Sequence, residues 1–309
     1  MKNPILIEAN LEDISRPANR PPKSNWQIDL LKKSLLALQH VAPKKTAKII
    51  WHYFTKPGRT RYSEAQEQLL KEAIVHKITY QGHQIYAYRW GTSGPKILLS
   101  HGWRSKAADF RRMISALVAQ GYVVEGIDMK AHGQSDGSHS ALPEFIDILK
   151  NYYVKHGPYH TVIGYSLGGL ASGMMLSEVT KEIHPAHLIL IATPPYARYF
   201  FHDIIKELKC KEEIYHQFCE LVAERYHQPV DYYDLRHKIS WLEAVQLHLI
   251  YDESDRTVSL EKGKELWQFA PEASFVHTKG LGHYKVIAYE GVIEHIIRAI
   301  RKVEKPMNV

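Results

Sequence analysis

Hydrophobic positions along the chain change their spacing at about residue 75. Beyond it, two strands joined at Gln81-Gly82 are followed by short apolar runs that alternate with segments of helical period. The six runs are "KILLSHGW", "YVVEGIDM", "HTVIGY", "HLILIAT", "LHLIYD" and "SFVHT". Because strands that alternate with helices need crossover connections, the pattern predicts an α/β fold with a mostly parallel eight-stranded sheet and helices on both faces.

Residues 1–74 have a different pattern, with three segments of helical spacing, "WQIDLLKKSLLALQHV", "KKTAKIIWHYF" and "SEAQEQLLKEAIV". The third begins with a Ser-x-x-Gln capping sequence. We therefore expect a helical N-terminal extension over 1–74 that packs on a main domain over 75–309. The alternative is a peripheral membrane contact through Lys44, Lys45 and Lys48 of the second helix.

The segment from about 194 to 245 interrupts the alternation of strands and helices. It is helical in pattern, rich in Tyr and Phe, and too long for a simple loop, so we expect an inserted cap. The aromatic rings either line a pocket for an apolar or aromatic group or pack the core of the cap itself, and the sequence leaves both open.

The stretch "HTVIGYSLGGLASGM" sets Ser166 between a strand and a helix. A serine hydroxyl is a weak nucleophile, so catalysis requires an exposed oxygen beside a base and near hydrogen-bond donors for the oxyanion. A tight turn from strand to helix supplies that geometry. We expect the Leu167 amide and the Trp103 amide, which follows the strand end at His101-Gly102, to form the oxyanion hole.

A base and an acid for Ser166 are expected downstream, at the same edge of the sheet. His283 lies in the glycine-rich stretch "KGLGHYKV" after the last strand, where an imidazole reaches the serine. Asp255, in the loop after "LHLIYD", is the favoured acid, and Asp252 at the strand terminus is its rival.

Composition narrows the range of functions. A net charge of +7 from 40 basic and 33 acidic residues, with no zinc-finger or RNA-binding signature, predicts a solvated surface and no nucleic-acid partner. Two cysteines whose spacing matches no metal or redox motif favour a reducing compartment. With no recognisable leader and no long apolar run, the expected location is cytoplasmic.

Taken together, these motifs resemble the α/β-hydrolase superfamily over residues 75–303. The matching residues are His101-Gly102, "HGQS" after Asp128, "GYSLGG", Asp255 and His283. More narrowly, the chain looks like a group of bacterial α/β hydrolases that carry a helical N-terminal extension, on the segments "FTKPGRTRYSEAQEQLLKEA", "YDESDRTV" and "GLGHYKV". The resemblance implies the α/β-hydrolase fold and a Ser166-His283-Asp255 triad.

The expected activity is hydrolysis of a small-molecule carboxylic ester through an acyl-enzyme, with no metal or organic cofactor. Two alternatives remain open. One keeps the triad but hydrolyses a thioester or transfers the acyl group to another acceptor. The other is a non-catalytic, ligand-binding member of the fold.

Overall fold

A computed structural model of the chain describes residues 3–9, 26–242 and 244–301, with side chains from residue 32 onward in the first helix. Part of the expected N-terminal extension, residues 10–25, therefore lies outside the described residues.

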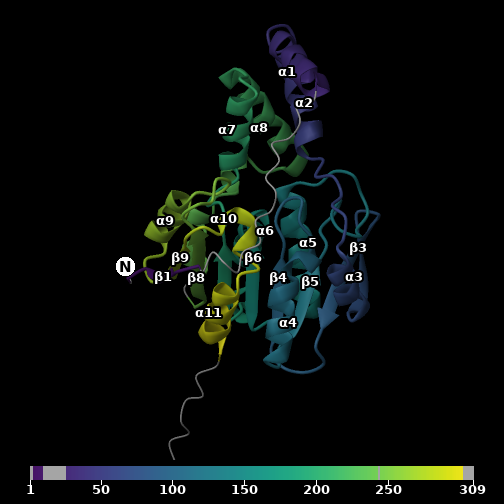
Figure 1. Cartoon of the computed structure of the whole chain (residues 1–309). Coiled ribbons are helices and arrows are strands. Elements are labelled where there is room, and N and C mark those ends of the chain that lie inside the picture. The colour runs from purple at the N-terminus through teal and green to yellow at the C-terminus, as the bar shows by residue number, and fades with distance from the viewer. Residues whose placement is uncertain (1–2, 10–25, 243, 302–309) are drawn as a thin grey trace, which may run out of the picture.

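A single mixed sheet forms the centre of the molecule (Figure 1). Its strands are β1 (Ile5–Ile7), β2 (Ile74–Tyr80), β3 (His83–Trp90), β4 (Lys96–Ser100), β5 (Val123–Ile127), β6 (Thr161–Tyr165), β7 (His187–Ile191), β8 (Gln246–Asp252) and β9 (Ser274–Thr278). They lie in the order β1-β9-β8-β7-β6-β4-β5-β3-β2. All neighbours are parallel except β2 with β3 and β3 with β5. The expected α/β architecture is confirmed.

The sheet has nine strands, not the expected eight, because β1 adds to its edge in parallel with β9. Residues 1–74 are therefore not purely helical. The three residues of β1 give no periodic signal of their own, since their partner strand lies about 270 residues away in the sequence.

The described helices either cover one of the two faces of the sheet or rise above it (Figure 1). They are α1 (Trp26–Leu38), α2 (Pro43–Phe54), α3 (Glu64–Lys71), α4 (Arg111–Ala119), α5 (Leu142–His156), α6 (Leu167–Ser177), α7 (Arg198–Glu207), α8 (Glu212–Tyr226), α9 (Leu260–Phe269), α10 (Gly282–Lys285) and α11 (Glu290–Ile300). Buried residues of α3, α4 and α11 form one core. Buried residues of α5, α6 and α9 join the cap in the other.

The expected cap between β7 and β8 contains α7, α8 and three short 3-10 turns. In Figure 1 it rises above the sheet together with α1 and α2. Aromatic contacts join the two groups, because Trp51 of α2 packs 5.1 Å from Phe218 of α8 and Phe54 lies 5.4 Å from Phe201 of α7, both between ring centroids. Helices α1 and α2 and the cap thus form one layer over the sheet, which we call the upper layer.

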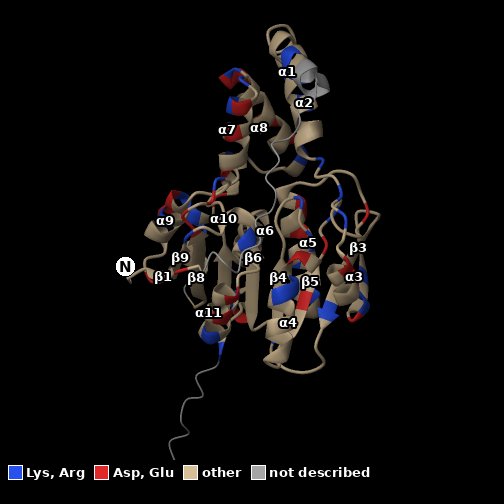
Figure 2. Ribbon diagram, viewed as in Figure 1, with Lys and Arg blue, Asp and Glu red and all other residues tan. Residues whose placement is uncertain are grey.

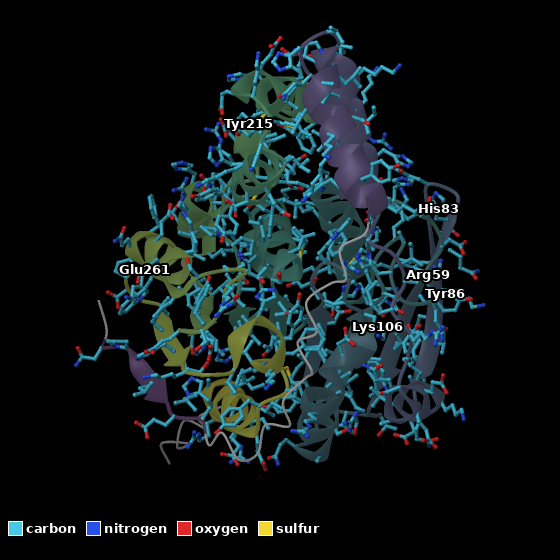
Figure 3. The ribbon with its side chains drawn as sticks, turned by 45° about the horizontal axis from the view of Figure 1, so that its top comes forward. Arg59, His83, Tyr86, Lys106, Tyr215 and Glu261 are labelled. Carbon is cyan, nitrogen blue, oxygen red and sulfur yellow. The ribbon has the colours of Figure 1, made fainter. Side chains whose placement is uncertain are left out.

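Residues 55–63 connect that layer to the sheet domain. Arg59 donates to the carbonyl oxygen of Ser135 at 2.9 Å, and Lys106 donates from Nζ to Thr60 Oγ1 at 2.9 Å; both basic residues are labelled in Figure 3. Beyond them, Ser63 and Gln66 complete the expected capping box of α3. These contacts fix where α2 meets the main domain.

Charged residues on the upper helices include both signs (Figure 2). Lys32 of α1 lies 3.8 Å from Glu207 of α7, and Lys44 of α2 lies 3.1 Å from Glu224 of α8. One of the three lysines considered for membrane contact is therefore directed towards the cap. Among the described helices, none combines the length and the apolar character needed to cross a bilayer.

Candidate active site

The turn that follows β6 presents Ser166 at the carboxyl edge of the sheet. Ser166 has a φ of 53° and a ψ of −125°, a conformation that L-residues rarely adopt, and α6 begins at the next residue. The expected sharp turn from strand to helix is confirmed by these angles. Backbone strain at one side chain in such a turn is characteristic of functional sites.

Close packing explains the glycines on either side of Ser166. A Cβ on Gly164 would lie 2.5 Å from the Cα of Gly169, and one on Gly168 would lie 2.3 Å from the carbonyl oxygen of His101. Neither backbone atom can move without displacing α6, which contains Gly169, or the turn directly after β4, which contains His101. The turn around Ser166 therefore requires glycine at both positions.

The structure brings Ser166, His283 and Asp255 together. His283 Nε2 lies 3.0 Å from Ser166 Oγ, and His283 Nδ1 lies 2.7 Å from Asp255 Oδ2. A carboxylate only accepts hydrogen bonds, so we assign the ring proton to Nδ1, which leaves Nε2 to accept from the serine hydroxyl. All three side chains are buried. His283 occupies the short helix α10, whereas the sequence predicted a loop.

Asp255 and Asp252 hold different partners. The second oxygen of Asp255, Oδ1, accepts from the amides of Thr257 and Val258, at 2.7 and 2.9 Å. Asp252 does not contact His283; it accepts from Thr278 Oγ1 at 2.6 Å and from the amides of three other residues. These are Ser254, Leu281 and Gly282. Asp252 therefore fixes the segment that carries His283, a role that the sequence did not reveal.

The turn after β4 lies directly against Ser166. A Cβ on Gly102 would be 2.8 Å from the Cβ of Ser166. His101 is fully buried, and its Nε2 accepts from the amide of Met129 at 3.0 Å while Nδ1 donates to the carbonyl of Gly102 at 2.8 Å. Burial lowers the pKa of His101, which keeps the ring neutral and the turn fixed.

Within the described residues, the amides of Trp103 and Leu167 donate to no backbone carbonyl. Leu167 is the first residue of α6, where amide groups have no partner inside the helix. Neither amide is therefore used in pairing with the backbone, and each is free to donate to another acceptor.

A contact that the sequence did not predict joins the turn at Ser166 to His283. The hydroxyl of Tyr165 donates to the carbonyl oxygen of His283 at 3.0 Å. Burial, the first of several causes, raises the pKa of Tyr165, so the hydroxyl stays protonated as a donor. The only sign of this contact in the sequence was the tyrosine immediately before Ser166.

An apolar cavity of about 90 Å³, which we call the apolar pocket, adjoins the turn at Ser166 through Leu167. Six of its lining residues are Trp51, Phe54, Trp103, Leu167, Phe200 and Phe201. Rings of the cap therefore both line this pocket and pack the cap core, where Phe218 lies 4.8 Å from Phe201 between ring centroids. The wall from α2 was not expected, since it depends on a contact between distant segments.

Over the part of the chain that the structure describes, no group of three or more His, Cys, Asp or Glu residues is arranged to hold a metal ion.

In sequence, the chain is similar to a serine aminopeptidase family, to a hydrolase and to a hydrolase-like protein. Residues 93–200 match the family described as serine aminopeptidase, S33. The uncharacterized hydrolase YugF of Bacillus subtilis (strain 168) is 24% identical over 257 residues, which cover 68% of this chain and 91% of the relative. A serine hydrolase-like protein of Homo sapiens is 30% identical over 119 residues, 37% of this chain and 57% of the human protein.

Among solved structures, the Pyrococcus furiosus esterase Pf2001 aligns with a TM-score of 0.58 at 21% identity, over 79% of this chain and 95% of the esterase. A thioesterase domain from the curacin biosynthetic pathway aligns with a TM-score of 0.54 at 16% identity, over 74% of this chain and 98% of that domain. At these identities the two likenesses establish a common fold.

Proposed function

Since this chain is a hydrolase that belongs to the α/β-hydrolase superfamily, we propose that it cleaves a carboxylic ester through an acyl-enzyme intermediate on Ser166. The observation that carries the proposal is the unbroken hydrogen-bonded series from Ser166 Oγ through His283 to Asp255, at 3.0 and 2.7 Å. Each member is in reach of the next for proton transfer or orientation.

The chemistry follows from these contacts. As Ser166 Oγ attacks the ester carbonyl carbon, His283 Nε2 takes its proton, and Asp255 stabilises the imidazolium that forms. The amides of Trp103 and Leu167 donate to the oxyanion. His283 then returns the proton to the departing alkoxide, which leaves the acyl group on Ser166. In the second half of the reaction, water attacks the acyl carbonyl carbon while His283 takes its proton, and His283 passes that proton to Ser166 Oγ as the carboxylic acid leaves.

The apolar pocket is proposed to bind the acyl group. It lies beside Leu167 and Trp103, whose amides are the proposed oxyanion donors, so a carbonyl held there directs its substituent into the pocket. Aromatic walls with few polar groups favour an apolar or aromatic acyl chain.

Turnover of a panel of p-nitrophenyl esters and one acyl thioester tests the proposal. Wild-type chain is expected to hydrolyse at least one ester, and Ser166→Ala to lose about 10⁶-fold in kcat with its fold intact by circular dichroism. Faster turnover of the thioester than of every ester would favour the alternative, in which the natural substrate is a thioester.

Ser172→Ala is the matched control, because Ser172 lies on α6 and donates to the carbonyl of Gly168, away from His283. A Ser166→Ala chain that keeps most of the wild-type turnover would exclude Ser166 as the nucleophile.

A further inference from the structure

A second cavity, which we name the basic basin, shares Trp51 and Ser140 with the apolar pocket. It is open to solvent, with a volume of about 660 Å³, and lies among α2, α8 and the segment between β5 and α5. His83, at the start of β3, also lines it and is labelled in Figure 3. A chain that extends from Ser166 through the apolar pocket would meet this basin next.

Basic side chains exceed acidic ones around the basin. Lys130 and Glu144, both buried, form an ion pair at 2.8 Å, and Glu224 is held by Lys44 at 3.1 Å. The charge of each carboxylate in the lining, on Glu144 and on Glu224, is therefore balanced by a lysine.

Two basic residues of the lining, Lys48 of α2 and Arg225 of α8, have no carboxylate within ion-pair distance among the described residues. They extend from opposite helices of the upper layer. Their charges make the basin attractive to an anion, by an amount that depends on salt because both residues are exposed.

Ser140 supplies an independent observation where the two cavities meet. Its amide donates to the carbonyl of Thr55 at 2.8 Å, which fixes its backbone, and the residue is 1% exposed. Its hydroxyl has no hydrogen-bond partner among the described residues. A buried hydroxyl without a partner is costly, and an oxygen ligand at this point would satisfy it.

We propose that the basic basin binds a carboxylate at the far end of the acyl chain, so that the preferred substrates are monoesters of dicarboxylic acids. The inference rests on the ester hydrolysis proposed above. The methylene segment occupies the apolar pocket, the Ser140 hydroxyl donates to a carboxylate oxygen, and Lys48 and Arg225 balance the charge. The upper layer thereby selects substrates by charge as well as by length.

Binding measurements test this inference separately from catalysis. In the Ser166→Ala chain, which leaves the ester intact, the affinities of monomethyl suberate and dimethyl suberate are measured by calorimetry at low and high salt. The anionic monoester is expected to bind about tenfold more tightly than the neutral diester at low salt. Adding Lys48→Gln or Arg225→Gln is expected to reduce this ratio about fivefold.

Lys45→Gln is the matched control, because Lys45 is an exposed lysine of the same helix that does not line the basin. It should leave the ratio unchanged. Equal binding of the two esters, or an equal decrease in the Lys45→Gln chain, would overturn the inference. Failure of the proposed hydrolysis would instead appear as absent ester turnover in the wild-type chain. The binding ratio is measured in the Ser166→Ala chain and does not depend on turnover, so the two failures can be told apart.

Discussion

At the scale of single residues, two aspartates three positions apart have different tasks. Asp255 contacts the imidazole of His283, whereas Asp252 accepts hydrogen bonds from the segment that precedes that histidine. The sequence favoured Asp255 because it lies in the loop beyond the strand. It could not show what Asp252 holds, because those partners, the Thr278 hydroxyl and the amides of Leu281 and Gly282, lie 26 to 30 residues away in the chain.

Substituting each aspartate should separate the two tasks. Asp255→Asn is expected to lower kcat about 10⁴-fold, because an amide no longer fixes the tautomer or stabilises the imidazolium. Asp252→Asn should cost about 1–3 kcal/mol in the free energy of unfolding, through lost charge-assisted bonds, with a much smaller loss of kcat. Ester kinetics and urea unfolding measure both effects. Equal losses of kcat in the two variants would contradict this division.

At the scale of elements, the sequence was informative wherever a signal was local. The strands after β3, the capping box of α3 and the turn at Ser166 all follow from short patterns of spacing. Features that depend on distant contacts were not predictable. The pairing of β1 with β9 and the packing of α2 on α8 join segments more than 150 residues apart, and no local period encodes them.

The position of α2 leads to a prediction about acyl length. Phe54→Ala removes a ring from the wall of the apolar pocket, so the preferred acyl chain should lengthen by about two carbons. Initial rates on p-nitrophenyl esters of increasing length measure the shift.

Tyr53→Ala serves as the matched control, since Tyr53 is the neighbouring ring on α2, is 56% exposed and does not line the pocket. An unchanged preference in Phe54→Ala, or the same shift in both variants, would argue against a pocket wall formed by α2.

At the scale of the whole molecule, the upper layer and the sheet domain meet around buried histidines. His132 is 1% exposed. Burial, and secondly the repulsion that two protonated rings would have at His101 and His132, lowers the pKa of His132 from 6.5 to about 3. The unfolded chain therefore binds a proton at this group between about pH 6.5 and pH 3, where the folded chain does not. Stability contributed by neutral His132 is present above this window and is lost as pH falls through it.

Acid should accordingly destabilise the fold. His132 alone accounts for about 2 kcal/mol of lost unfolding free energy between pH 7 and pH 5. Urea unfolding at the two pH values measures the loss, and His132→Gln should reduce the difference by about that amount. His216→Gln, at an exposed position on α8, should not. A pH difference that is equal in all three chains would refute this assignment.

Covalent labelling with a fluorophosphonate tests the central claim most directly, because the reagent reports an activated serine whatever the natural substrate is. Wild-type chain is expected to be labelled on Ser166, as mapped by mass spectrometry. Labelling should disappear in Ser166→Ala and in His283→Ala, which lacks the base 3.0 Å from the serine. A folded wild-type chain that is not labelled, or a Ser166→Ala chain that is labelled equally, would contradict the account.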